Sequence, residues 1–195
     1  MDISFESREI PIYSEYFHQA RRIQETAECV VPDTDADIEK IAAVQSEIFL
    51  KSKDLSARGV LVSGEVNATV FYIRDGREGL SFLTIRKPFS LEYELEAPES
   101  ETLAQVVLLM QGTDVRMVNP RKIAVGFEIE GDLSCYRCEK LRVGSVLPEN
   151  ASGLHVRIEE QVLTLPNAVC EKSVAVNEQF TFPAGSALPN IFDIF

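Results

Sequence analysis

IAVGFEIEGDLSC, residues 123–135, is the stretch of sequence that decides the fold class. Apolar residues occupy almost every odd position, and small or acidic residues occupy the even positions. Alternation with a period of two is typical of a β-strand with one buried and one solvated face. The pattern therefore predicts a long strand whose odd-numbered side chains point into a core.

Two earlier segments repeat this alternation. In residues 60–72 the apolar side chains alternate so that they share one face of the strand. The apolar side chains of residues 80–95 do the same. The glycine-containing run RDGREG, residues 74–79, supplies a turn between them, so the two strands are expected to be antiparallel. Lys87-Pro88 marks a bulge or a sheet edge, because proline cannot donate to a strand ladder. The inward side chains predicted in this way are Val60, Val62, Val66, Val70, Tyr72, Phe89, Leu91, Tyr93 and Leu95.

The remaining segments complete an all-β pattern. Residues 102–118 are read as a strand, and Asn119-Pro120-Arg121-Lys122 as the hairpin turn after it. Further strands are expected at 3–12, 20–31, 42–55, 154–165 and 169–182. Asp35 is expected to cap a single helical turn over 35–41. The predicted fold is an antiparallel β-sandwich or open barrel built from long hairpins, with one or two short helical turns.

The two ends of the chain resemble each other. ETAECVVP, residues 25–32, and VNEQFTFP, residues 176–183, are each followed by a spacer and a short apolar run. A repeated order of this kind indicates a repeated unit. We therefore expect amino-terminal strands at 1–31 that pack on one β module at 32–182, with 183–195 as a linker or the start of a following module.

The overall composition favours a water-soluble protein. The chain has 195 residues, of which 45% are hydrophobic and 26% are charged, and a net charge of −12. It contains no apolar run long enough for a membrane span, and its amino terminus lacks the features of a signal peptide, so a cytoplasmic location is expected. The negative charge disfavours nucleic acids and anionic membranes as partners and would suit a basic protein.

The sequence offers few groups for catalysis or metal binding. His18 and His155 are the two histidines, each in a polar stretch, and no motif with a known mechanism is present. The four cysteines, 29, 135, 138 and 170, include a CxxC pair that could form part of a zinc site. Cys135 falls on the apolar face of its strand and Cys138 on the other, which favours small buried hydrophobes over a metal. No enzyme activity and no cofactor are predicted.

Charged and aromatic residues supply the candidate surfaces. Six acidic residues recur at period two on predicted outer faces and would form one docking face if their two strands share a sheet. Arg121 and Lys122 could clamp an anion, but their place in a turn favours a structural role. Phe71, Phe89, Tyr93 and Phe127 are read as core residues. The acidic candidates are Glu92, Glu94, Glu96, Glu128, Glu130 and Asp132.

Three runs in the chain resemble a known family. GVLVSGEVNATVFYIRDG, KPFSLEYEL and VNPRKIAVGFEIEGDL, followed by a strand that ends in proline, are similar to the SPOCS domain of endospore-forming Firmicutes. The resemblance spans about 31–194. It departs from the family at Ala36-Asp37-Ile38, where a proline often precedes the aspartate.

The resemblance implies a non-enzymatic role in spore-envelope morphogenesis. SPOCS modules often occur in tandem ahead of a LysM domain, and members of the SipL type attach to the coat's basement-layer ATPase on the mother-cell side of the forespore. Three functions are therefore compared. A structural assembly module that contacts other spore-envelope proteins, or further copies of itself, is preferred over a glycan or cell-wall ligand module. An enzyme is the third, and it would need a histidine within hydrogen-bond reach of an acidic residue.

Overall fold

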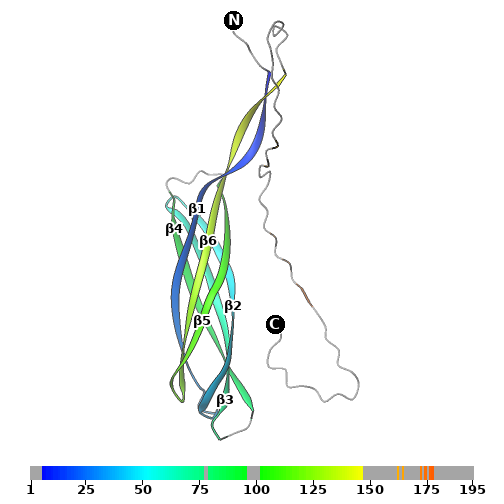
Figure 1. Cartoon of the computed structure of the whole chain (residues 1–195). Helices are drawn as coiled ribbons and strands as arrows, with labels where there is room; N and C mark the ends of the chain where they lie inside the picture. Colours follow the sequence, from blue (N-terminus) through cyan, green and yellow to red (C-terminus); the bar gives the residue numbers. More distant parts are fainter. Residues whose placement is uncertain are drawn as a thin grey trace, which may run out of the picture.

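The computed structural model describes residues 6–76, 79–95 and 102–146, together with a few single positions from 162 to 177. The described residues form six strands that lie in two three-stranded antiparallel sheets, packed face to face (Figure 1). One sheet has the order β1-β6-β5 and the other β2-β3-β4. The strands are β1 (Glu6–Val30), β2 (Ile38–Ser56), β3 (Gly59–Arg74), β4 (Leu80–Glu94), β5 (Leu103–Asn119) and β6 (Lys122–Val146).

The fold class predicted from the sequence is confirmed as an all-β sandwich. Every side chain assigned inward in residues 60–72 and 80–95 is at most 6% exposed, and the odd positions of residues 123–135 are buried. These faces pack into one core between the sheets. Lys87-Pro88 lies on the edge strand β4, whose register with β3 is unbroken, so it marks an edge and not a bulge.

Two local predictions are wrong. Residues 35–41 contain no helical turn: the chain makes a turn at Asp33-Thr34, and β2 begins at Ile38. Ile38 N donates to Pro120 O, and Asp37 O accepts from Asp75 N, so these backbone groups are bonded to other strands and hairpins and cannot close a helical turn. Phe71 is not a core residue, because it points to the outer face of β3 beside Phe82.

Some expectations fall outside the described residues. These are, apart from the single described positions 162, 164, 172, 174, 176 and 177, the strands expected at 154–165 and 169–182, the second copy of the end motif at 176–183, and the side chains of His155, Glu96 and Cys170. The segments expected at 3–12 and 20–31 belong, where described, to the single strand β1. No helix in the described part of the chain has the length and hydropathy to cross a membrane.

Side chains close the two long seams where the sheets meet. At the β1–β4 seam, Arg21 donates to Glu92 O, and the Lys87 ammonium lies 3.0 Å from the Glu25 carboxylate. At the β2–β5 seam, Ser46 and Thr113 share a hydrogen bond of 2.6 Å, and Lys53 donates to Ala104 O. The contacts that join these edges come from side chains, so the fold is a sandwich and not a continuously hydrogen-bonded barrel.

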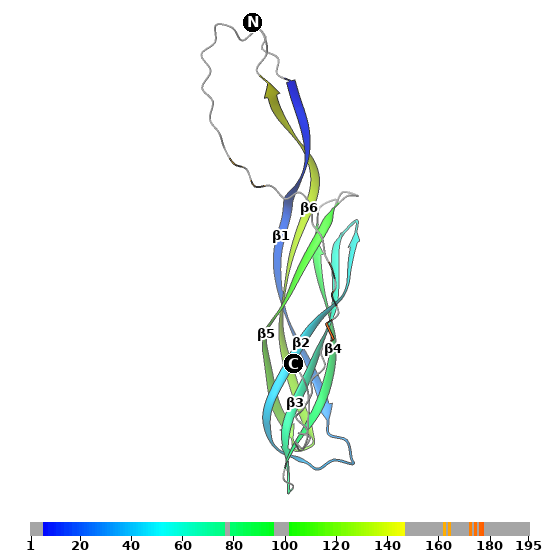
Figure 2. The ribbon, with the colours of Figure 1, turned by 90° about the vertical axis from the view of Figure 1, so that its right-hand side faces the viewer.

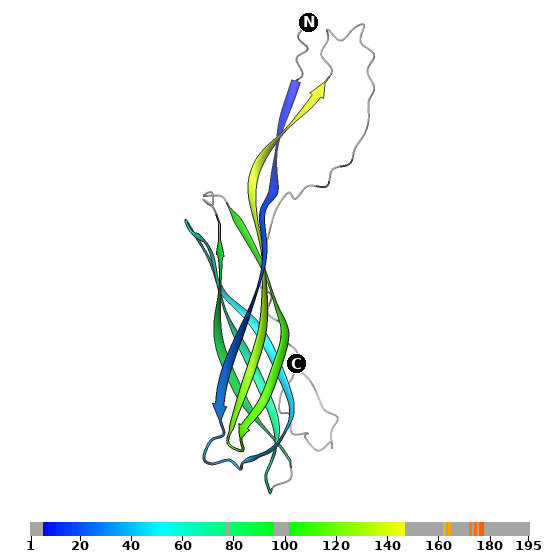
Figure 3. The same ribbon diagram turned by 60° about the vertical axis from the view of Figure 1, so that its left-hand side comes forward.

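A two-stranded ribbon extends from one end of the sandwich (Figures 2 and 3). The ladder between β5 and β6 ends at the pair Leu103 and Tyr136, whereas β1 and β6 remain paired to Glu6 and Val146. The register of β1 shifts between Glu15 and Phe17, at the level where β5 ends. A bulge bends and twists the strand that carries it, so this shift changes the direction of the ribbon where it leaves the sandwich.

Tyr93 makes the free energy of unfolding depend on pH in the alkaline range. Its hydroxyl donates to Gly131 O at 2.7 Å, and burial, the largest cause, raises the pKa of Tyr93 to about 12. The unfolded chain loses this proton near pH 10, so its stabilising contribution is complete below about pH 10 and is lost as pH rises through about 12. We expect Tyr93→Phe to make the fall in unfolding free energy between pH 10 and 12 shallower. Urea denaturation at several pH values in this range measures the unfolding free energy of both proteins. The prediction is contradicted if this free energy falls equally steeply with pH in the Tyr93→Phe variant and in the unchanged chain.

Candidate interaction surfaces

The predicted acidic residues do not form one face. Glu92 and Glu94 project outward from β4, whereas Glu128, Glu130 and Asp132 project outward from β6, and these strands belong to different sheets. The condition for a shared docking face, that both strands lie in one sheet, is not met. Alternation along each strand assigned the outward direction correctly, but it carries no information about sheet membership.

Two of the β6 carboxylates have partners on the outer face of their own sheet. Glu130 Oε2 accepts from Arg22 Nε at 2.6 Å and from Gln111 Nε2 at 3.0 Å. Asp132 Oδ1 lies 2.6 Å from His18 Nε2. The Arg22 guanidinium offsets part of the negative charge on β6, so this face is less acidic than its sequence indicates.

Glu128 borders a shallow hollow on the same face. The hollow has a volume of about 310 Å³, and the absence of side chains at Gly112 and Gly126 leaves space between Gln24, Asp114 and Glu128. Phe127 is the aromatic residue that borders it and is only 1% exposed. Carbohydrate sites usually combine polar groups with an aromatic surface. The hollow therefore gives little support to a glycan-binding module.

His18 meets the one geometric condition that the sequence analysis set for an enzyme. It has an acidic partner, Asp132, within hydrogen-bond reach, but both side chains are about half exposed. Within the described residues His18 makes this one hydrogen bond, and no nucleophile is bonded to its ring. A general base normally lies in a site that shields its proton transfer from water and positions a substrate. The pair has the form of an exposed hydrogen bond on the protein surface.

The three cysteines that the structure describes, Cys29, Cys135 and Cys138, are spread along the β1–β6 pair. Cys29 lies opposite Ile123, and Cys135 lies opposite Phe17, so the length of β6 between Ile123 and Cys135, roughly 40 Å, separates them. Burial raises the pKa of the Cys135 and Cys29 thiols. Cys138 is exposed on the other face of β6. No group of three or more potential ligands in the described part of the chain is arranged to hold a metal ion.

The predicted turn Asn119 to Lys122 is present and joins β5 to β6. Its conformation is stabilised by Asn119 Oδ1, which accepts from Arg121 N at 2.9 Å. Lys122 Nζ lies 2.6 Å from Glu28 Oε2 on β1. Backbone bonds then tie the turn to the β1–β2 connection, because Val31 N donates to Arg121 O and Ile38 N donates to Pro120 O.

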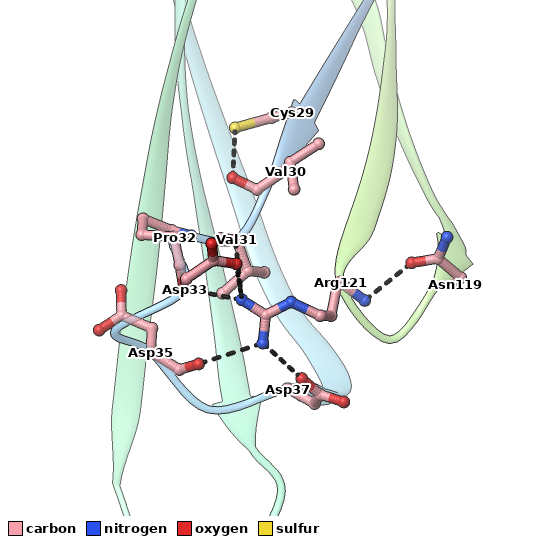
Figure 4. Close-up of polar contacts among 9 residues, drawn as sticks. All are labelled: Cys29, Val30, Val31, Pro32, Asp33, Asp35, Asp37, Asn119 and Arg121. Carbon is pink, nitrogen blue, oxygen red and sulfur yellow. Dashed lines mark hydrogen bonds and ion pairs between the residues drawn. The ribbon is translucent and has the colours of Figure 1, made fainter.

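The Arg121 guanidinium lies inside that connection (Figure 4). It donates to the Asp37 carboxylate at 2.8 Å and to the Asp33 carboxylate at 3.3 Å. It also donates to three main-chain carbonyls, Pro32 O at 2.9 Å, Val31 O at 3.1 Å and Asp35 O at 3.4 Å. Both terminal nitrogens of the guanidinium therefore donate to the protein itself, which argues for the structural role and against an anion clamp.

An apolar row on the outer face of the second sheet was missed by the sequence analysis. Ala43, Phe71 and Phe82 are direct neighbours across β2, β3 and β4, and Leu80 follows Phe82 on the same face. Phe82 is 46% exposed and Leu80 is 41% exposed. The available signal was that Phe71 and Phe82 both break the polar alternation of their outer faces. Grouped exposed apolar side chains are typical of protein contact surfaces.

Comparison with models of known protein families finds a match in the middle of the chain. The family model described as SipL, SPOCS domain, matches residues 37–118, which confirms the resemblance noted in the sequence. The matched range begins just before β2 and ends one residue before the end of β5, so it includes the whole β2-β3-β4 sheet but neither β1 nor β6. No curated protein and no solved structure matches the chain.

Proposed function

Because residues 37–118 carry a SPOCS domain, we propose that the chain is a non-catalytic structural module that helps to assemble the spore coat or envelope through protein–protein contacts. The observation that carries the proposal is the family match, which indicates a sporulation-related module. The matched range includes the apolar row of Ala43, Phe71 and Phe82. Exposed apolar rows of this kind suit contacts with another protein.

The proposal extends to location and partner class. A module of this kind would act in the mother-cell cytoplasm, at the surface of the forespore, and would bind other spore-envelope proteins. A coat basement-layer ATPase is one such partner, reached through the full-length protein. The described surface supports contact with proteins more than chemistry, because His18 and Asp132 form an exposed pair and the hollow beside Glu128 lacks an aromatic surface.

We expect the chain, fused to a fluorescent protein, to gather at the forespore of sporulating cells and to stay diffuse in vegetative cells. Phe82→Glu should reduce the fraction at the forespore by about tenfold, because it places a charge in a contact that must lose water. Thr84→Glu is the matched control, since Thr84 is also exposed on the outer face of β4. A fusion that remains diffuse throughout sporulation would refute the proposed role.

A further inference from the structure

The edges of the sandwich are protected against the addition of another strand. Arg21 at one seam and Lys53 at the other each donate to a backbone carbonyl of the facing edge strand, Glu92 O and Ala104 O. An exposed strand edge accepts a partner through its free N–H and C=O groups, and cationic side chains are a common means of blocking it. These contacts obstruct the addition of a partner strand at the two seams.

Among the residues that the structure describes, one edge of β6 in the ribbon has no neighbouring strand. From Arg137 to Val146, β6 is paired with β1 on one side, and β5 has already ended on the other. The outer edge of β1 is a poorer acceptor, because it contains Pro11, which has no N–H. On an edge strand, the side of a proline that would carry the N–H normally faces solvent, where no donor is needed. The β6 edge contains no proline.

One face of the ribbon carries exposed apolar side chains. Ile10 lies opposite Leu141, and Ile12 and Val143 lie on the same face. Leu141 and Val143 have the odd numbering of the inward residues of β6, so this face continues the core side of the sheet beyond the sandwich. Ile10 is 40% exposed and Val143 is 39% exposed. A strand added to the β6 edge would cover part of this surface if its own side chains on that face were apolar.

The opposite face of the ribbon carries excess positive charge. Lys140 and Arg142 both pair with Glu9, at 3.3 and 3.4 Å, so two cations share one carboxylate. Their side chains are 75% and 72% exposed. This local surplus contrasts with the net charge of −12 for the chain. Acidic side chains of an added strand would lie next to these cations and would be attracted to them.

We propose that the β6 edge from Arg137 to Val146 accepts an extended strand of another protein in which apolar and acidic side chains alternate. The apolar residues would cover Leu141 and Val143, and the acidic ones would pair with Lys140 and Arg142. Main-chain hydrogen bonds would supply affinity and the alternating side chains would supply specificity, as in other cases of strand addition. This inference rests on the proposed function, because it names a surface and a partner chemistry for an assembly module.

A synthetic ten-residue peptide that alternates glutamate and valine tests the proposal on the whole chain. Hydrogen exchange should show that amides within residues 137–146 become protected when the peptide is added, while exchange in β3 is unchanged. A peptide with lysine in place of glutamate should bind at least about tenfold more weakly, because each favourable charge pair becomes a repulsive one. Lys140→Glu with Arg142→Glu should weaken binding of the glutamate peptide by about tenfold.

The control variant is Lys51→Glu with Arg86→Glu, which makes the same change in net charge on exposed positions of the sandwich. It should bind the glutamate peptide almost as the unchanged chain does. The proposal is overturned if residues 137–146 gain no protection, or if both double variants lose equal affinity. It is also overturned if protection rises with protein concentration alone, since a second copy would then occupy the edge. Forespore localisation with no peptide binding would reject this surface and leave the proposed function intact.

Discussion

Replacing Gly59 with alanine should lower the free energy of unfolding by about 4 kcal/mol, from overpacking and backbone strain that each cost roughly 1–3 kcal/mol. A Cβ at this position would lie 1.8 Å from Tyr93 O. The obstacle is backbone and not the end of a flexible side chain, so strands β3 and β4 would have to separate where Gly59 opposes Glu94. The φ of Gly59 is 141°, which side chains rarely allow.

The matched control is Gly76→Ala. Gly76 also has a positive φ, 64°, but nothing lies within 4 Å of a Cβ built there. Its substitution should cost only about 1 kcal/mol, the ordinary penalty for a left-handed non-glycine residue. Urea denaturation followed by circular dichroism measures both, and the midpoint of the Gly59 variant should fall by about 2 M for an m-value near 2 kcal/mol/M. If both variants lose the same free energy of unfolding, backbone strain alone accounts for the loss and the clash with Tyr93 O adds nothing.

The inward faces of the strands were predictable because alternation maps directly onto burial. Val62, Val66 and Val70 are completely buried, and so is Ile129 on the facing sheet. Phe71 was misassigned because its aromatic character was given more weight than its odd position in a strand whose even positions are buried. Hydrophobic identity and strand phase disagreed at this residue, and the phase was the better guide.

Sheet membership and the ribbon were not readable from the same pattern. Glu92 and Glu130 both face outward, but only the pairing of whole strands places them on different sheets. Ile10 and Leu141 alternate like core residues, yet they lie beyond the end of the opposite sheet and are not covered by it. Alternation reports which side of a strand is apolar. Whether a second layer covers that side depends on the lengths of strands that are distant in sequence.

The role of Arg121 was predictable only in outline, because its partners precede it by 84 to 90 positions. The turn chemistry of Asn119-Pro120 indicated a hairpin, and that prediction is confirmed. The aspartates at 33, 35 and 37 were read as a cap and a spacer. In the structure the carboxylates of Asp33 and Asp37 and the main-chain carbonyl of Asp35 accept from a single guanidinium. A run of carboxylates in one connection and a lone arginine in a distant turn carry no sequence signal of pairing.

Arg121→Ala should lower the free energy of unfolding by about 2–3 kcal/mol, because charge-assisted hydrogen bonds contribute roughly 1.5–3 kcal/mol when their partners lose them. The expected loss comes mainly from Asp37 and the carbonyls of Val31 and Pro32, since Asp33 is fully exposed and its pair is screened by water. Arg121→Lys should recover only part of the loss, because an ammonium cannot span acceptors on both sides of the connection.

Lys122→Ala is the matched control for Arg121→Ala. Lys122 is adjacent in the same turn and makes one exposed ion pair with Glu28, so its loss should cost less than about 1 kcal/mol. Hydrogen exchange separates the two effects further. Val31 and Ile38 flank the connection and are 1% and 2% exposed, and their amides donate to the turn. Arg121→Ala should speed exchange at both amides while Lys122→Ala leaves them protected. If both variants exchange alike, the backbone bonds hold the connection without the guanidinium, and the position could accept other residues without loss of the fold.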